Sequence, residues 1–250
     1  MLATDTLFYS GTSGVALPLP KAHFPPPFQD KSRLHYYASL FNSVEINSIF
    51  YKLPKPSTIA NWRESVPDHF RFTFKVSKGI THVKGLHFAA KDVDDFIKTV
   101  NQVDGKKGCL LAQFPPSLQI EKLDGLQRLL EALGERTHNS GWRIAMEFRH
   151  ASWYEREVYE LLEEYNVSLV IHDIPQSATP LHGITSNFIY LRFHGPEPRY
   201  GGDYADEVLK RYAEYIKTWM SEKKMVFTYF NNTLGAAVKN LQTLNSYVLF

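Results

Sequence analysis

The chain has 250 residues, of which 44% are hydrophobic, so it is long enough to bury a substantial core. Its 28 basic and 26 acidic residues give a formal net charge of +2, which provides no overall attraction to nucleic acid or to an anionic membrane. Residues 1–8 lack the basic and apolar regions of a signal peptide, and no stretch is apolar enough to span a membrane, so we expect a cytoplasmic protein without membrane contact. The single cysteine, Cys109, lies in an apolar run and is predicted to be a buried packing thiol.

Short apolar segments rich in β-forming residues recur along the whole sequence. They cover residues 7–10, 44–46, 72–76, 109–113, 143–148, 168–172, 188–193 and 226–230. Each is mostly apolar on both faces, which is typical of strands covered on both sides.

Helical patterns lie between most of these segments. Apolar residues recur with a period near 3.6 over residues 93–103, 123–133, 158–165 and 209–219. Ser32 and Ser57 are predicted to cap two earlier helices, and Asn232 or Thr233 the last one. The stretch 175–186, after the sixth predicted strand, shows no clear helix.

Alternation of strands and helices predicts a parallel sheet. Eight such units in 250 residues favour an α/β fold of one domain, a single (β/α)8 TIM-type barrel over residues 1–250, irregular after strand six. Two unusual loops, the proline-rich 12–31 and the Gly-rich 195–204, follow strands and are therefore expected at the C-terminal face, where barrel active sites lie.

Polar and charged residues stand at the ends of seven predicted strands. They are Glu45, Asn47, Lys75, Gln113, Glu147, Arg149, His150, His172, Asp173, Arg192, His194, Tyr229, Asn231 and Asn232. Charged groups inside apolar strands are costly unless they are paired or hydrated. Their shared position therefore predicts one wet cavity at the mouth of the barrel.

Each of these residues also has a structural interpretation. Glu45 and Glu147 either contact a ligand or form buried ion pairs with Lys75, Arg149 or Arg192. The remaining alternatives are a core histidine for His194, a turn cap for Asp173, turn and N-cap roles for Asn231 and Asn232, and packing for Trp153 and Tyr51.

Three kinds of chemistry fit the set. Lys75, Arg149, Arg192 and His194 suit an anion such as phosphate or carboxylate, and we favour this interpretation. Glu45 and Glu147 could form a carboxylate pair for acid–base or glycosidic chemistry. A divalent metal on Glu45, Glu147, Asp173 and His194 is possible but not favoured, because no H-E-x-x-H spacing supports it. No dinucleotide or P-loop motif is present, so the cofactor is unknown.

We therefore name two groups of candidate residues. The catalytic candidates are Glu45, Glu147, Asp173 and His194. The ligand-binding candidates are Asn47, Tyr51, Lys75, Gln113, Arg149, His150, Trp153, Arg192, Tyr229, Asn231 and Asn232.

Several motifs in order along the chain resemble those of one family. They are Gly11-Thr12-Ser13-Gly14, Phe41-Asn42-Ser43-Val44-Glu45-Ile46-Asn47-Ser48, Phe74-Lys75 with Ile80-Thr81-His82, Gln113-Phe114-Pro115, Glu147-Phe148-Arg149-His150 with Ser152-Trp153, Tyr190-Leu191-Arg192-Phe193-His194-Gly195 and Tyr229-Phe230-Asn231-Asn232. The chain resembles the YecE-like proteins, catalogued as domain of unknown function seventy-two. The resemblance implies a TIM-type barrel but no settled activity. One departure is Val15-Ala16-Leu17-Pro18, where the family usually places Trp and then Tyr, and we expect the proline-rich loop to replace that lid.

Our first functional hypothesis is an enzyme acting on a small anionic substrate, phosphorylated or carboxylated. Glu147 or Glu45 would be the acid–base group, and Lys75, Arg192 and His194 would hold the anion. One alternative is a metal-dependent enzyme on nucleic acid, against which the near-neutral charge counts. The other is a non-catalytic module that binds a metabolite or docks a partner. Hydrolase, lyase and isomerase chemistry are not distinguished, and the oligomeric state stays open.

Overall fold

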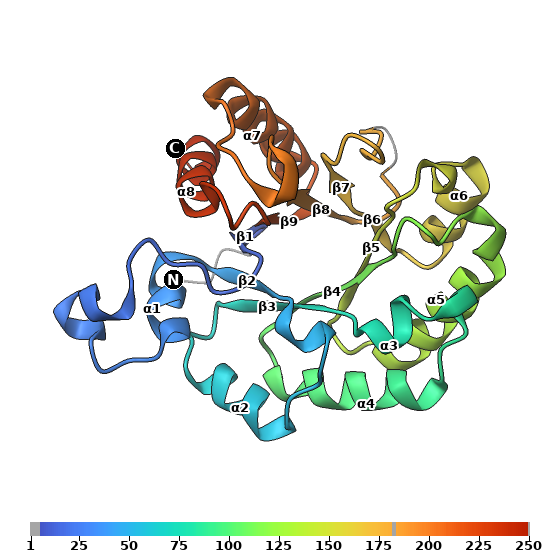
Figure 1. Ribbon diagram of the computed structural model, residues 1–250, viewed down its shortest axis with the longest axis horizontal. Helices are drawn as coiled ribbons and strands as arrows, with labels where there is room; N and C mark the ends of the chain where they lie inside the picture. Colours follow the sequence, from blue (N-terminus) through green and yellow to red (C-terminus); the bar gives the residue numbers. More distant parts are fainter. Residues whose placement is uncertain (1–5, 182–183, 250) are drawn as a thin grey trace.

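The computed structural model describes residues 6–181 and 184–249 (Figure 1). The strands are β1 Phe8–Thr12, β2 Ser43–Ile46, β3 Arg71–Lys75, β4 Lys107–Gln113, β5 Arg143–Glu147, β6 Ser168–Leu169, β7 Ile171–His172, β8 Phe188–Phe193 and β9 Met225–Phe230. The helices are α1 Arg33–Leu40, α2 Pro56–Glu64, α3 Lys78–Thr81, α4 Ala90–Val100, α5 Leu123–Thr137, α6 Arg156–Glu164, α7 Asp206–Ser221 and α8 Ala237–Leu249. Residues 1–5, part of the segment 1–8 in which no signal peptide is predicted, lie outside the described residues. So do residues 182 and 183, which belong to the stretch 175–186 predicted to contain no helix.

All strand pairings are parallel, as the alternation of strands and helices predicts. They form two sheets, with strand orders β1-β9-β8-β7 and β2-β3-β4-β5-β6. Figure 1 shows the helices outside the strands, which surround the centre of the molecule.

The two sheets meet at two places. The sixth predicted strand, 168–172, is divided at Val170, so that β6 pairs with β5 while β7 pairs with β8. On the other side, β1 and β2 are joined by a single bridge between Ser13 and Glu45, and the Gly14 amide donates to the Glu45 carbonyl at 2.6 Å. The single continuous barrel sheet expected from the sequence is thus replaced by two parallel sheets, because hydrogen-bond pairing is interrupted at these junctions.

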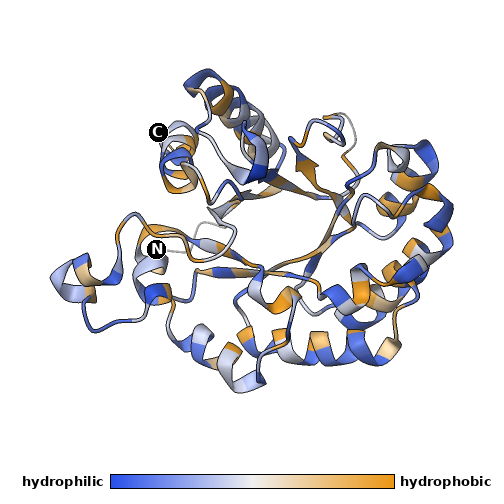
Figure 2. Cartoon of the chain, viewed as in Figure 1, coloured by the Kyte–Doolittle hydropathy of each residue, from blue (hydrophilic) through white to orange (hydrophobic). Residues whose placement is uncertain are grey.

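Two apolar clusters fill the molecule. The larger one lies between the strands and the helices and includes the buried faces of α4 and α5. The smaller one contains alternate residues of the strands, among them Tyr9, Leu111, Tyr190 and Phe227, together with the predicted buried thiol Cys109. Because successive side chains of a strand point to opposite faces, this second cluster occupies the space that the strands enclose. Figure 2 shows hydrophobic and hydrophilic residues on the same helices, as expected when one face of each is buried.

Helix starts agree only in part with the predicted caps. The Ser32 side chain accepts a hydrogen bond from the His35 amide at 3.0 Å and caps α1, which confirms that prediction. The prediction for Ser57 is wrong, because α2 begins at Pro56, a residue whose fixed φ suits the first helical position. The prediction for Asn232 or Thr233 is also wrong: α8 begins at Ala237.

The stretch between β7 and β8 contains no helix in the part that the structure describes, as predicted. The proline-rich loop 12–31 forms two 3-10 turns, and its Phe24 and Phe28 pack on Tyr36 of α1 at ring distances of 4.5 and 4.9 Å. In Figure 1 this loop projects beside α1 at the left. Its replacement of the family's aromatic lid stays a prediction. No helix within residues 6–181 and 184–249 combines the length and apolar character needed to cross a bilayer.

Candidate functional site

Three charged residues meet at the C-terminal ends of the strands. Arg192 on β8 lies between Glu45 on β2 and Glu147 on β5, and all three are buried. The Arg192 Nε donates to both Glu45 oxygens at 3.1 and 2.9 Å, and Nη2 donates to Glu45 Oε1 at 2.8 Å. Its Nη1 donates to Glu147 Oε2 at 3.1 Å. We call these three residues the Arg192 triad.

Glu45 accepts further hydrogen bonds from its surroundings. Ser13 Oγ donates at 2.6 Å, Asn47 Nδ2 at 3.0 Å and the Tyr190 hydroxyl at 2.6 Å. Burial alone would raise the pKa of Glu45, but the charge and hydrogen bonds of Arg192 outweigh it and lower that pKa below its usual value. Glu45 is therefore a buried carboxylate anion with every oxygen engaged.

Glu147 is held by groups on its own strand end and on β8. Arg149 Nε donates to Glu147 Oε1, and His194 Nε2 lies 3.3 Å from the same oxygen. Despite complete burial, Arg149 and Arg192 keep the pKa of Glu147 well below its ordinary value. The carboxylate is thus ionised at neutral pH and shared between two guanidinium groups.

His194 is a neutral imidazole at this position. Burial, together with the charge of Arg192, lowers the pKa of His194 to about 3, although Glu147 acts in the opposite direction. The Asn231 Nδ2 lies 3.0 Å from Nδ1, while Nε2 lies 3.3 Å from both Glu147 Oε1 and Arg192 Nη1. His194 is therefore uncharged at neutral pH and a poor base.

Lys75 forms the next part of the mouth. Its Nζ donates to Gln113 Oε1 at 2.8 Å and lies 4.1 Å from the centre of the Phe50 ring. The His82 ring packs nearly perpendicular to the Phe50 ring with the ring centres 4.9 Å apart, and burial lowers the pKa of His82 to about 4. Burial, with the charge of Arg192, lowers the pKa of Lys75 to about 8.

A cavity of about 550 Å³ opens beside these groups. Arg149 and His194 form one wall, and residues 174–176 and 195–200 form the others. Tyr200 packs over His194 with the rings 5.7 Å apart. Gly195 has a φ of 105°, and a Cβ there would lie 2.2 Å from the Gly201 carbonyl oxygen, so only glycine fits this turn of the loop.

The sequence matches the family described as "Protein of unknown function DUF72" over residues 9–249. The chain belongs to this family. The resemblance indicated by the motifs is thereby confirmed.

Relatives of this DUF72 chain include the UPF0759 protein YecE of Escherichia coli (strain K12), 30% identical over 155 residues. The match covers 60% of this chain and 53% of YecE, so the chain spans about half the length of that relative.

Two solved structures have a similar fold. A DUF72 family protein of Enterococcus faecalis V583 gives a TM-score of 0.78 at 23% identity, covering 97% of this chain and 96% of that one. A xylose isomerase domain protein of Alicyclobacillus acidocaldarius gives 0.54 at 10% identity, covering 90% and 96%. These likenesses concern the fold alone: an α/β fold of parallel strands with TIM-barrel-type neighbours.

Two candidate residues of this DUF72 chain have structural partners and lie outside the cavity lining. Asp173 Oδ1 accepts the His194 backbone amide at 2.8 Å, and its other oxygen accepts the Tyr204 hydroxyl. His150 Nδ1 accepts the Ser152 amide at 3.2 Å and caps a short turn. The two side chains thus hold backbone turns in place, which supports their structural interpretation, and the catalytic role of Asp173 and the ligand-binding role of His150 stay predictions.

Four further candidates lie away from the charged mouth. Trp153 is fully buried, stacks on Phe148 at 4.7 Å and donates to the Leu118 carbonyl at 2.8 Å. The buried Tyr229 hydroxyl bonds to Ser43 and Thr73, and buried Asn232 donates to Gly202 and Asn240. Tyr51, by contrast, is 80% exposed. Their burial or outward position gives no support to the predicted ligand contacts.

Sequence reasoning missed other members of the site. Ser13 and Tyr190 complete the shell of Glu45, Tyr204 holds Asp173, and His82 packs beside Phe50. Tyr190 stands two residues before Arg192, so period-two alternation along the strand could have identified it. Ser13 and His82 stand in the motifs that carry the family resemblance, which could have pointed to them, whereas Tyr204 depends on a long-range contact that carries no local signal.

The donor geometry gives no support to a metal site. Among the described residues, no group of three His, Cys, Asp or Glu side chains is arranged to hold a metal ion. Arg192 occupies the space between Glu45 and Glu147, where a shared cation would have to lie. The Asp173 oxygens are already engaged by backbone and hydroxyl donors.

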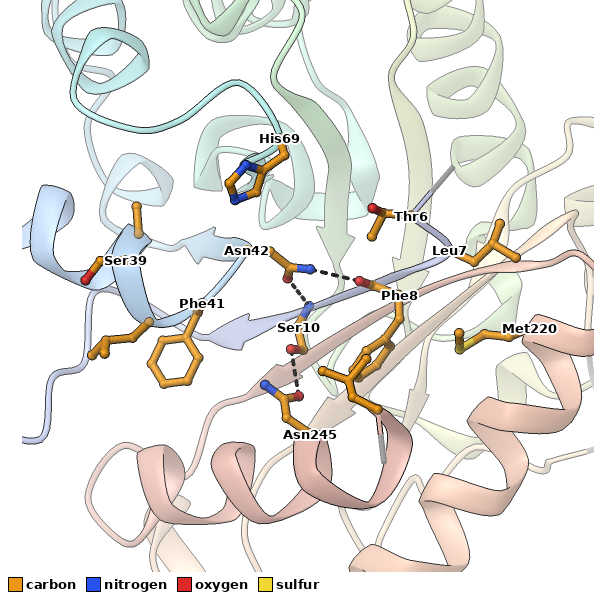
Figure 3. A pocket seen from close by; sticks show the side chains of 13 residues that line it. Thr6, Leu7, Phe8, Ser10, Ser39, Phe41, Asn42, His69, Met220 and Asn245 are labelled. Atoms are coloured by element: carbon orange, nitrogen blue, oxygen red, sulfur yellow. Dashed lines mark hydrogen bonds between the residues drawn. The ribbon is translucent and has the colours of Figure 1, made fainter. Parts of the chain in front are cut away.

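A second cavity, of about 490 Å³, lies at the start of β1, between α1 and α8 (Figure 3). Its polar groups satisfy one another: the Asn42 amide bonds to the Ser10 amide and the Phe8 carbonyl, each at 2.9 Å, and Ser10 Oγ donates to Asn245 at 2.8 Å. Because these groups are already paired, we place the candidate site at the opposite, charged mouth.

Proposed function

We propose that the charged mouth binds a small anionic molecule, carrying phosphate or carboxylate, and that it is the active site of an enzyme. The observation that carries this proposal is the distribution of charge. Glu45 and Glu147 are fully buried and engaged, whereas Arg149 lines the open cavity. The two carboxylates are held by Arg192 and Arg149, whereas Lys75 and the cavity-lining Arg199 form no ion pair among the described residues, so these two cations can meet an incoming anion beside the one acidic residue of the cavity wall, Glu197.

The roles differ from those expected from the sequence. Glu45 and Glu147 are proposed to orient Arg192, Arg149 and His194, since a fully buried carboxylate held by a guanidinium is a weak base. Arg149 would make the charged contact with the anion, because a guanidinium can bind phosphate or carboxylate through two parallel hydrogen bonds. Arg199, which lines the same cavity, adds a second cation.

We also propose that the two sheets act as one closed eight-stranded barrel in a single domain. The support is that β6 and β7 are separated by Val170 alone, whose amide donates to the Met146 carbonyl at 2.9 Å. The Ser13–Glu45 bridge joins the other edges. In this arrangement the mouth corresponds to the C-terminal face, where barrel enzymes carry their active sites.

Thermal unfolding with added anions tests the binding. Inorganic phosphate and small phosphorylated or carboxylated metabolites should raise the Tm by mass action. Arg149→Gln should weaken binding by about 10- to 100-fold, since a charged hydrogen bond contributes roughly 1.5–3 kcal/mol. Arg199→Gln should weaken it less, and it leaves the contact with Glu147 untouched.

Arg156→Gln is the matched control, because the Arg156 side chain on α6 is 90% exposed and lies outside the cavity. No stabilisation by any anion, or equal loss in the control, would overturn the anion site. Binding without conversion of any ligand would leave the module interpretation in place of the enzyme.

A further inference from the structure

Lys75 differs from Arg149 and Arg192 in having no acidic partner. Within residues 6–181 and 184–249 it forms no ion pair, and its Nζ contacts the neutral Gln113 amide oxygen and the face of Phe50. Surface lysines such as Lys91 and Lys210 are paired with Asp95 and Asp206, which raises their pKa values. Lys75 therefore lacks the carboxylate partner that these surface lysines have.

The surroundings of Lys75 raise the fraction of its side chain that is neutral at physiological pH. Burial is the main cause of its lowered pKa of about 8, and the charge of Arg192 adds to it. At pH 7.5 a lysine with that pKa is about a quarter neutral, against roughly one part in a thousand at the ordinary value of about 10.4. Desolvation and a neighbouring cation are the usual means by which enzymes make a lysine nucleophilic.

The position of Lys75 suits a substrate anchored on Arg149. Lys75, Gln113 and Arg149 stand at the ends of the adjacent strands β3, β4 and β5. Lys75 is in register with Leu111, and Leu111 with Ala145, so the backbone of Arg149 lies two strands across, about 10 Å, and four residues further along the chain. Besides burial, the charge of Arg149 nevertheless lowers the pKa values of both Lys75 and the neighbouring His82, so the long side chains of Lys75 and Arg149 bring their cationic groups near each other. Arg149 lines the cavity, and the half-buried Lys75 lies beside its lining, so a substrate anchored on Arg149 has to extend past the cavity edge to reach Nζ.

We propose that Lys75 forms an imine with the carbonyl carbon of a small anionic aldehyde, ketone or oxo acid, an assignment that rests on the proposed anion site at Arg149. The Nζ lone pair attacks the carbonyl carbon, and the carbonyl oxygen takes a proton to give a carbinolamine. That hydroxyl leaves as water after a second protonation, and the Nζ–C double bond forms with loss of one Nζ proton. The balance is amine plus carbonyl plus one proton giving a protonated imine and water, without any redox change. Gln113 accepts a hydrogen from Nζ and so orients the lone pair.

Reductive trapping tests the imine. The native protein is incubated with pyruvate or glyceraldehyde 3-phosphate, reduced with sodium borohydride, and mapped by peptide mass spectrometry. The expected result is one dominant secondary amine at Lys75, which excess inorganic phosphate suppresses. Lys75→Arg should lose this adduct. The control Lys78→Arg, three residues away at the start of α3, should keep it.

Mapping of the unsubstituted chain makes the test independent of whether a variant folds. Adducts spread over surface lysines with none at Lys75, or equal labelling of Lys75→Arg, would overturn the proposal. Anion-dependent stabilisation without any adduct would refute the imine and leave the anion site standing. Labelling of Lys75 by uncharged glycolaldehyde, unchanged by Arg149→Gln and by phosphate, would support the amine and refute the anion site.

Discussion

Replacing Arg192 by Met tests the energetic reasoning most directly. Methionine keeps the length of the side chain but removes the donors to Glu45 and Glu147, and leaves Glu45 without a cation. Removing one partner of a buried ion pair costs about 3–5 kcal/mol. For a chain of this size, in which 1 kcal/mol corresponds to about 2–4 °C, the Tm should fall by about 10 °C.

The pH dependence of this loss has a definite sign. In the native protein the pKa values of Glu45 and Glu147 are lowered, so the stability they contribute is complete above the unfolded pKa of about 4.3 and is lost only at lower pH. In Arg192→Met, burial acts on Glu45 without the compensating charge of Arg192, and only hydrogen bonds, among them those from Ser13 and Tyr190, still oppose it, so the pKa of Glu45 rises. The variant should therefore be most destabilised at pH 8 and approach the native protein as the pH falls toward 4–5.

Urea unfolding between pH 5 and pH 8 measures this difference. Adding Glu45→Gln to Arg192→Met should restore part of the stability, because it removes the unpaired charge. Arg156→Met on the exposed face of α6 is the control and should change the free energy of unfolding by less than about 0.5 kcal/mol. A loss below about 1 kcal/mol in Arg192→Met, or a loss independent of pH, would refute the reasoning.

Three other side chains give sharp expectations. Trp153→Phe should lower the free energy of unfolding in urea by about 1 kcal/mol, because the donor to the Leu118 carbonyl is lost. Its anion affinity should be unchanged, and weakened binding would show that Trp153 contacts the ligand. Tyr51→Ala should shift the unfolding free energy by less than about 0.5 kcal/mol, since the side chain is 80% exposed. Cys109 is buried and its pKa is raised by burial, so a thiol reagent such as Ellman's should react only after denaturation, and rapid reaction of the native protein would contradict the buried assignment.

Much of the fold follows from local pattern. Strands and helices were predictable because buried parallel strands are short and apolar and the helices between them carry apolar stripes. Details set by a single competing residue were not, as Pro56 shows by starting α2 one position before the expected cap. The division of the sixth strand at Val170 also has no sequence signal, because it depends on which neighbour each half pairs with.

The candidate site was predictable in location but less so in role. The cost of burying charge indicated that Glu45, Glu147 and Arg192 must have ion-pair or hydrogen-bond partners, and in the structure Arg192 pairs with both carboxylates. Asp173 and Trp153 were expected at the ligand because polar tips and aromatic rings at strand ends suit binding. Their actual partners, the His194 amide and the Leu118 carbonyl, come from distant segments that no single-sequence pattern connects.

The Arg192 triad has a consequence for how this protein can change. Arg192 belongs to one sheet, and both carboxylates that it binds belong to the other. The triad that contacts Arg149 and His194, two residues of the cavity wall, thus also links the two sheets. Selection for a new substrate at these positions would weaken the scaffold at the same time. We therefore expect sequence changes that alter the substrate to occur in the loop 195–204, where cavity residues can vary without breaking the ion pairs between the two sheets.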